Sequence, residues 1–464
     1  MKPSALLAGA AQVDITPPMG VEMCGYGWYE KRLCTEILDR LQARALWLEV
    51  GEQAVAILAV DLCTIDLATH AAVARQLEAA CGLRSEKLMI CASHTHSGPA
   101  TQYMIAWGER DPGYMARLPA ALAEAVLQAR TAAVPARCGA CRTRISDVGV
   151  NREQPALAPL DTAAQLLRVD REDGAPVAVL YNFGAHGVAR YPFTSRISAD
   201  WPGLVAACIA DEMGGVPALF LQGPCGNINA HDMTFERRAP EIRQQVCDAR
   251  AGEVARRFSA QILPALKTLK TSPPAELRTL WKSIPLPCLP TDCAEMERLV
   301  RDHQALADGM TLAQLRPLHE RMSSETGAER AWREARWNVD RARRQMDLLT
   351  RQPPQVREAV IQVIKLGDAV LVGWPAEVFV ELGLELRQRS PFPLTFVSSF
   401  TNDTVGYIPT AAAYESKGKG NDFGRYPRDF THFIYGHLPF RDDVGRILVE
   451  ESMGMLNALA AGGK

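Results

Sequence analysis

Short apolar runs alternate along the chain with segments of helical spacing, which is typical of an α/β protein. The apolar runs that predict strands lie at 45–50, 54–60, 87–91, 164–169, 176–181, 218–221, 359–364, 369–372 and 394–398. The segments that predict helices lie at 67–81, 114–131, 204–212, 242–269 and 444–459. Polar, glycine-containing turns at 51–53 and 172–174 predict two β-hairpins. We therefore expect an α/β fold of mixed β-sheets flanked by helices.

The segment from about 291 to 352 has a different composition, rich in Arg, Glu, Leu and Ala at helical spacing. It predicts a helical hairpin inserted between strands of a single domain that spans 1–464. Its many arginines predict a solvated helix face. They are Arg330, Arg333, Arg336, Arg341, Arg343 and Arg344.

Composition and charge exclude several classes of protein. The chain has 464 residues, 47% of them hydrophobic, and a net charge of -2, which argues against a nucleic-acid binder. No apolar run reaches the roughly 18 residues that a membrane span needs, so we expect no integral membrane segment. The short apolar stretch at 5–11 does not resemble a secretory signal, and we expect a cytoplasmic location. Self-association into a homo-oligomer stays open.

Polar side chains follow five of the predicted strands, directly where each strand ends. In chain order they are His94 and His96, His186, Asn229, Glu377, and Tyr407. Ligand sites in α/β sheets lie outside the carboxyl ends of strands. The pattern therefore predicts one site, at strand carboxyl ends, that collects these six residues.

The pair His94 and His96 raises the prospect of a metal. A lone histidine after a strand is more often a hydrogen-bonded core residue than a ligand. In an extended segment, however, side chains at i and i+2 point the same way. Both imidazoles then reach one metal, or one binds while the other handles protons. Two histidines and one carboxylate with an open position form a catalytic zinc set.

Six motifs in order along the chain resemble the neutral ceramidase family. They are SHTHSGP at 93–99, NR at 151–152, NFGAH at 182–186, QGPCGNIN at 222–229, WPAE at 374–377 and NDTVGYIPTAAAYE at 402–415. The opening AQVDITPPMG at 11–20 also fits that family's first strand. The resemblance covers about 8–460. It implies that His94, His186, Glu377 and Tyr407 bind Zn²⁺, that His96 lies near the scissile bond, and that Arg152 is an active-site arginine.

The chain departs from the family's pattern at two places. Asn229 stands where ceramidases have a serine that grips the primary hydroxyl of the sphingoid base. Residues 415–420 stand where ceramidases carry a further active-site tyrosine. The family's C-terminal immunoglobulin-like domain is not expected, so the chain looks like a catalytic domain alone. We therefore expect a small, more polar N-acyl substrate than ceramide, with an anionic group paired by Arg152, Lys417 or Lys419.

These residue types suit hydrolysis of an amide. Zinc lowers the pKa of its water toward about 7 and polarises a carbonyl. His96 is the candidate general acid and base. Tyr407 either binds zinc or donates a hydrogen bond to the developing oxyanion. Arg152 and Asn229 are the candidate substrate-binding residues.

We therefore expect a zinc-dependent amidohydrolase that acts through a metal-activated water. A zinc-dependent esterase or lactonase and a true ceramidase are the alternatives. A zinc-stabilised binding protein would not need the second histidine, His96. Serine hydrolysis is disfavoured because the chain has no G-x-S-x-G elbow.

Overall fold

The computed structural model describes residues 5–153, 159–190, 194–231, 240–274, 276–290, 292–321, 324–350, 356–415 and 431–462. The strands within these residues are β1 Leu6–Asp14, β2 Glu36–Ile37, β3 Gln42–Val50, β4 Gln53–Val60, β5 Leu88–Ala92, β6 Val134–Arg144, β7 Val150–Asn151, β8 Ala163–Arg171, β9 Pro176–Phe183, β10 Arg196–Ile197, β11 Ala218–Gln222, β12 Ile228–Asn229, β13 Leu277–Pro287, β14 Val356–Leu366, β15 Ala369–Gly373, β16 Glu377–Val378, β17 Leu394–Ser398 and β18 Tyr407–Ile408. The helices are α1 Leu67–Cys81, α2 Pro112–Thr131, α3 Asp200–Glu212, α4 Pro240–Thr268, α5 Cys293–Ala307, α6 Leu318–Arg321, α7 Gly327–Leu349, α8 Val380–Arg389, α9 Ala411–Glu415, α10 Thr431–Ile434 and α11 Val444–Ala461.

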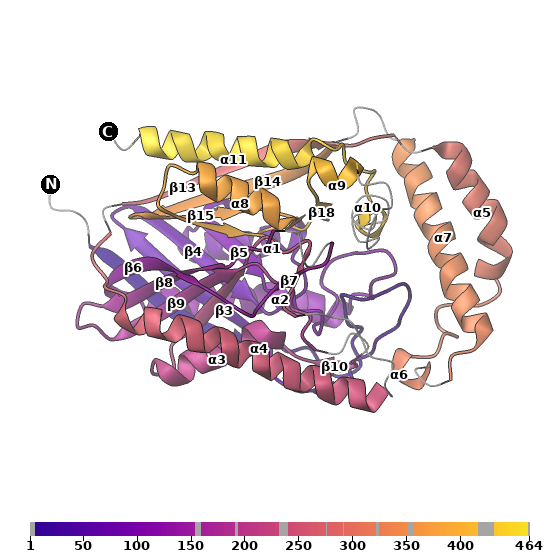
Figure 1. Cartoon of the computed structure of the whole chain (residues 1–464), viewed down its shortest axis with the longest axis horizontal. Helices are drawn as coiled ribbons and strands as arrows, with labels where there is room; N and C mark the ends of the chain where they lie inside the picture. The colour runs from indigo at the N-terminus through magenta and orange to yellow at the C-terminus, as the bar shows by residue number, and fades with distance from the viewer. Residues whose placement is uncertain are drawn as a thin grey trace.

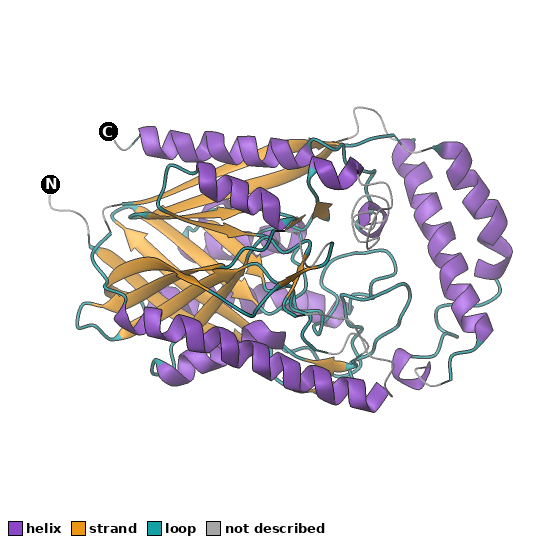
Figure 2. Ribbon diagram, in the orientation of Figure 1, coloured by secondary structure: helices purple, strands orange, loops and turns teal. Residues whose placement is uncertain are grey.

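Two sheets pack face to face, and helices cover the outer face of each (Figure 1). The larger sheet has the order β11-β9-β8-β6-β1-β3-β4-β5, and the smaller one β13-β14-β15-β17. Parallel and antiparallel neighbours occur in both sheets. Figure 2 shows the strands of both sheets between the flanking helices. The α/β fold of mixed sheets flanked by helices, predicted from the sequence, is confirmed.

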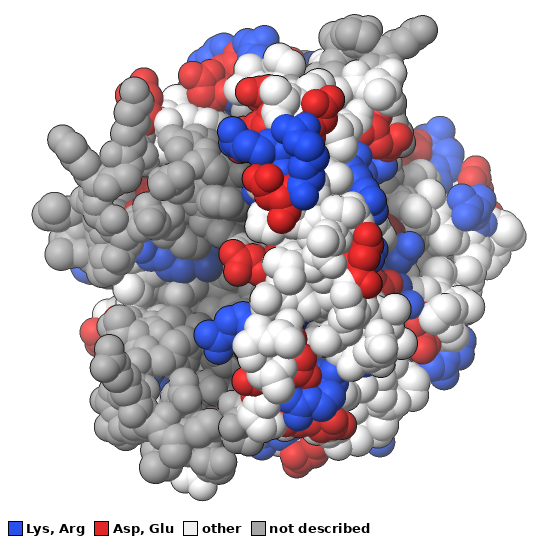
Figure 3. Space-filling model, turned by 90° about the vertical axis from the view of Figure 1, so that its right-hand side faces the viewer, with Lys and Arg blue, Asp and Glu red and all other residues white. Residues whose placement is uncertain are grey.

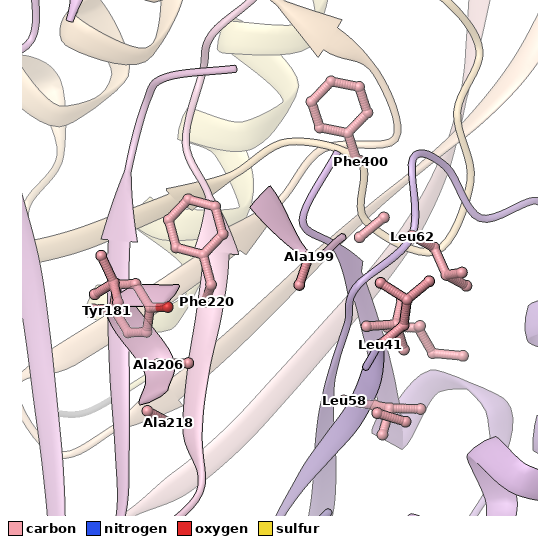
Figure 4. Close-up of a cluster of buried hydrophobic side chains, with 14 of the residues drawn as sticks. Leu41, Leu58, Leu62, Tyr181, Ala199, Ala206, Ala218, Phe220 and Phe400 are labelled. Atoms are coloured by element: carbon pink, nitrogen blue, oxygen red, sulfur yellow. The ribbon is translucent and has the colours of Figure 1, made fainter. Parts of the chain in front are cut away.

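The alternation of side chains along β3 and β4 explains why the larger sheet is buried on both faces. Ala45 and Trp47 pack toward the helices α1–α4, whereas Leu46 and Leu48 pack toward the smaller sheet. Figure 4 shows part of the core on the helix side. Its labelled residues are Leu41, Leu58, Leu62, Tyr181, Ala199, Ala206, Ala218, Phe220 and Phe400. Helices α8 and α11 close the outer face of the smaller sheet in a third core.

The segment after β17 joins the two edges of the larger sheet. Ser399 donates its backbone N–H to the Gln222 carbonyl at the end of β11 (2.7 Å). The next residue, Phe400, accepts a hydrogen bond from the N–H of Ala92 at the end of β5 (3.1 Å). The carboxyl ends of β5 and β11 therefore meet at a seam, although these strands lie at opposite ends of the sheet order.

The segment between β13 and β14 contains α5, α6 and α7, and α5 packs against α7 (Figure 1). Most of the described residues of this segment are helical. The charged face is not only solvated, because Arg333 bridges Glu30 (2.7 Å) and Glu325 (2.9 Å) with its side chain only 14% exposed. On the surface at this end of the molecule, basic and acidic side chains are interspersed (Figure 3).

Predicted elements agree with observed ones to within a few residues, and α1 matches at both ends. The long strands β6 and β13 have no counterpart among the predicted elements, β1 is matched only by the motif at 11–20, and the helix α8 has none. The strands β6 and β13 alternate half-exposed and buried positions and carry Arg, Lys or Pro. Neither therefore contains the continuous apolar run that would predict a strand. No helix in the described ranges has the length and apolar character needed to cross a bilayer.

Candidate active site

His94 lies two residues beyond β5 in a conformation that differs from the predicted one. Its φ is +62°, so the His94–His96 segment is not the extended chain expected from sequence. The buried His94 ring stacks on Phe400, with centroids 3.9 Å apart. The Nε2 atoms of His94 and His96 are still only 3.0 Å apart. A left-handed residue at this turn, rather than strand alternation, brings the two rings together.

Backbone carbonyls fix the ring orientation of His94 and His186. His94 Nδ1 lies 2.8 Å from the Cys63 carbonyl oxygen, and His186 Nδ1 lies 2.9 Å from the Ile228 carbonyl oxygen. A carbonyl only accepts, so each Nδ1 carries a proton, and in the neutral ring each Nε2 keeps its lone pair. This is the arrangement that metal-binding histidines use. Because His94 Nε2 keeps its lone pair, His96 donates from its Nε2 to His94 Nε2 in the metal-free chain.

Glu377 completes a three-residue group with these histidines. Its Oε1 lies 2.7 Å from His186 Nε2 and 3.6 Å from His94 Nε2. The three ligand atoms all lie within 4.8 Å of one another, and all three residues are buried. Burial raises the pKa of the Glu377 carboxyl, but His94 and His186 outweigh this and lower it overall. Burial and then Arg152 lower the pKa of His186 to about 4.

The donor set fits zinc. Two neutral imidazole nitrogens and one ionised carboxylate converge in a site shielded from water, and each imidazole is oriented by a second hydrogen bond. Short β-ladders set this convergence. His186 forms a β-bridge with Asn229. Glu377 in β16 is the register partner of Tyr407 in β18, so the carboxylate and the phenol start from adjacent backbone positions.

Arg152 and Tyr407 lie beside this group. Arg152 Nη2 is 3.3 Å from the Tyr407 hydroxyl, 3.3 Å from His186 Nε2 and 3.9 Å from Glu377 Oε1. It also donates to the Gly226 carbonyl. One guanidinium nitrogen thus lies near the Tyr407 hydroxyl and near the ligand atoms of His186 and Glu377.

His96 is held against a glycine. A Cβ on Gly25 would lie 2.5 Å from His96 Cγ, so only glycine leaves room for the ring. Tyr26 meets the same ring edge-on, with centroids 4.9 Å apart. Burial, and then His94 and His186, lower the pKa of His96 well below its ordinary value. The ring is therefore neutral near pH 7.

Asn229 also lies at the site, next to His186. Its Oδ1 is buried and has no hydrogen-bond partner in the described part of the chain. Lys417 and Lys419 lie outside the described residues. Asp61, directly after β4, pairs with Arg44 at 2.9 Å.

Several contributors have no signal in the sequence. The carbonyl of Cys63, the ring of Phe400 and the space above Gly25 belong to no motif. Only Cys63 offers a chemical hint, since its thiol, His94 and His96 form a second group of close donor atoms. These contributors to the site can be identified only once the fold brings distant segments together.

Comparison with solved structures shows the same fold in known ceramidases. Neutral ceramidase from Pseudomonas aeruginosa superposes with a TM-score of 0.71 at 17% identity, over 98% of this chain and 75% of that one. A ceramidase complexed with C2 superposes with a TM-score of 0.72 at 18% identity, over 99% and 76%. No curated protein sequence matches the chain.

A family model extends the likeness from fold to sequence. The model described as neutral/alkaline non-lysosomal ceramidase, N-terminal, matches residues 6–252, which is more than half of the chain. This range contains His94, His96, Arg152, His186 and Asn229. The chain therefore belongs to the neutral/alkaline non-lysosomal ceramidase family, whose activity makes it an amide-bond hydrolase.

Proposed function

We propose that the chain is a zinc-dependent amidohydrolase, with 1–464 acting as a single catalytic domain, that cleaves a small or polar N-acyl compound rather than ceramide. The observation that supports zinc most directly is the convergence of three donors from segments far apart in sequence. His94 Nε2, His186 Nε2 and Glu377 Oε1 lie within 4.8 Å of one another. Both imidazoles present an unprotonated nitrogen to the same space.

The residues around this space divide the work of hydrolysis. His94, His186 and Glu377 would hold a zinc ion, which would supply a Lewis acid for the carbonyl and lower the pKa of water. His96 accepts the proton of the attacking water and delivers it to the leaving amine, a contribution of about 10²–10⁴-fold. Arg152 donates a hydrogen bond to the carbonyl oxygen as it gains charge, and the Tyr407 hydroxyl, 3.3 Å from Arg152, either donates a second one or binds the zinc.

Tyr407 has two possible roles that one variant separates. Tyr407→Phe removes the hydroxyl and keeps the ring. If the hydroxyl stabilises the oxyanion, the variant keeps its zinc and loses kcat. If the hydroxyl is a zinc ligand, zinc content falls together with kcat. Elemental analysis of the purified variant distinguishes the two.

The substrate proposal rests on the polar character of the loop that carries Asn229. The buried Oδ1 of Asn229 needs a donor from the substrate, because an unmade hydrogen bond there costs about 1–3 kcal/mol. The neighbouring Asn227 donates to Glu381 (3.0 Å) and Glu153 (3.4 Å). A loop with these groups suits a polar leaving group, and Arg152 is placed to pair with an anionic one.

Two alternatives share the same metal site. Membership of a ceramidase family favours ceramide itself, and an ester or lactone would need the same donors but a weaker catalyst. The test measures kcat/KM for short N-acyl amino acids, N-acyl amines, long-chain ceramide and lactones in one assay. Short N-acyl compounds should be cleaved best. Efficient ceramide turnover with little activity on the short compounds would overturn the substrate proposal and leave the zinc proposal standing.

A cytoplasmic location and a homo-oligomeric state stay predictions from the sequence. Fractionation of the producing cells tests the first, and light scattering of the purified protein tests the second. Neither outcome bears on the chemistry proposed for the site.

A further inference from the structure

A buried arginine lies directly behind His96. Arg32 is 1% exposed. Its Nη2 donates to the carbonyl oxygen of His96 (2.6 Å) and to that of Cys24 (3.2 Å). None of the motifs that resemble the family includes Arg32.

The same guanidinium reaches His96 by a second route, through an aromatic ring. Arg32 Cζ lies over the ring of Tyr26, 5.0 Å from its centroid. Tyr26 in turn meets the His96 ring edge-on at 71°. Cation–π and edge-to-face contacts are both attractive and favour a defined ring orientation. Arg32 therefore contacts the backbone of His96 directly and its ring through Tyr26.

The backbone of His96 is anchored on both sides. Its N–H donates to the Gly187 carbonyl (3.0 Å), and its carbonyl accepts from Arg32. Gly187 directly follows His186, so this bond ties His96 to the segment of a candidate zinc ligand. Removing the donor at position 32 takes away this partner of the His96 carbonyl and leaves it free to rotate away.

The segment that carries Arg32 is itself braced by the helical insertion. Glu30 accepts from Arg333 (2.7 Å) and pairs with Arg321 (3.4 Å), and both arginines belong to the insertion. Trp28 stacks on Trp337 of α7, with centroids 5.5 Å apart. These contacts fix the position of residues 28–32, which include Arg32.

We propose that Arg32 is a positioning residue for His96, holding its backbone through the carbonyl and its ring through Tyr26. The proposal rests on the acid/base role proposed for His96. A planar guanidinium is needed because one nitrogen must reach two carbonyls while its face covers a ring, which a lysine ammonium cannot reproduce. A misplacement of about 1 Å at a reacting group can lower a rate about 10²-fold.

The test compares Arg32→Met, Arg32→Lys and Tyr26→Leu, each in the wild-type and the His96→Ala background. The assay measures kcat, KM, zinc content and the thermal midpoint on the fastest compound of the amide and ester panel. Arg168→Met is the matched control. Arg168 lies on β8, away from the site, and it also donates to a backbone carbonyl, that of Leu266.

We expect Arg32→Met to lower kcat about 10–100-fold with KM and zinc content nearly unchanged. Arg32→Lys should recover part of the loss. In the His96→Ala background the same substitutions should lower kcat no further, since residues that act through one another are not additive. Arg168→Met should lower the thermal midpoint and leave kcat unchanged.

Each other outcome is decisive. An unchanged kcat in Arg32→Met, or a loss that is undiminished when His96 is alanine, would overturn the positioning role and leave the acid/base role of His96 intact. If His96→Ala itself keeps full kcat with zinc bound, both the acid/base role and the positioning role fall. If Arg32→Met does not fold, Tyr26→Leu decides by the same criteria. If neither folds, the pair serves stability and the proposal is wrong.

Discussion

Gly25 shows how one backbone position fixes the geometry of the site. Its φ is +110°, and an added Cβ would lie 2.5 Å from Cγ of His96. Gly25→Ala should therefore push the His96 ring out of place and lower kcat at least 10-fold, with zinc retained because His94 and His186 are untouched. The measurement is kcat together with zinc content.

Gly20→Ala is the matched control for this substitution. Gly20 also has a positive φ, +85°, but a Cβ there meets nothing within 4 Å. Both variants carry the backbone strain of alanine at positive φ, so only the contact with His96 differs. Equal effects on kcat in the two variants would show that backbone strain, not the position of His96, controls the rate.

Glu22, in the same segment, makes the stability of the chain depend on pH. Burial raises its pKa to about 7, with Lys31 and Arg32 opposing the rise. The folded chain thus holds this proton more tightly than the unfolded chain. The resulting stability is complete below about pH 4.5 and is lost as the pH rises through 7.

Glu22→Gln removes this dependence because the amide cannot ionise. The variant should gain free energy of unfolding over the wild type as the pH rises from 5 to 8.5, on the order of 2 kcal/mol at the upper end. Urea unfolding of both proteins at each pH measures the difference, in which all other titrating groups cancel. A difference that is constant with pH would refute the assigned pKa.

The predictions made from sequence also succeed and fail residue by residue. The motifs place His94, His186 and Glu377 at strand ends, and the structure brings the three together. The extended geometry expected between His94 and His96 is wrong, since φ at His94 is +62°. A left-handed residue is set by its tertiary surroundings, here the Phe400 ring and the Cys63 carbonyl, and apolar spacing carries no trace of it.

At the scale of elements, strands buried on both faces could be read from the sequence, and half-exposed strands could not. β5, β11 and β15 are fully buried and appear as continuous apolar runs. β6 and β13 alternate and carry charged residues or prolines. The two-residue strands β16 and β18, which align Glu377 with Tyr407, are too short to give any pattern.

Helix α7 offers a test of how the insertion supports the site. Arg333, with a side chain 14% exposed, joins Glu30 to Glu325, and Arg333→Gln should therefore lower the stability by about 1–3 kcal/mol. It should also lower kcat, because the segment 28–32 loses part of its bracing. Urea unfolding and kcat are the measurements.

Arg330→Gln is the control on the same helix. Arg330 contacts the same Glu325 at 3.3 Å, but its side chain is 75% exposed, and exposed ion pairs contribute about 0–1 kcal/mol. Its stability and kcat should stay near those of the wild type. If Arg333→Gln behaves like Arg330→Gln, the insertion does not support the site.

At the scale of the whole molecule, the site exists because the larger sheet brings its two edges together. His94 follows β5 at one edge, His186 follows β9 near the other, and Glu377 follows β15 of the smaller sheet. The segment 398–402 holds these ends side by side through Ser399 and Phe400. No local pattern predicts this seam, because it depends on strand order and on the packing of one sheet against the other.

The zinc content of purified chains tests the central claim most directly. Elemental analysis compares the wild type with His186→Ala and with His70→Ala, a buried histidine that lies away from the site and contacts the Leu88 carbonyl at 3.1 Å. The wild type and His70→Ala should hold equimolar zinc, and removing it should abolish amide hydrolysis, whereas His186→Ala should hold little zinc and have no activity. Equimolar zinc in His186→Ala, or full amide hydrolysis by the zinc-free wild type, would contradict the account.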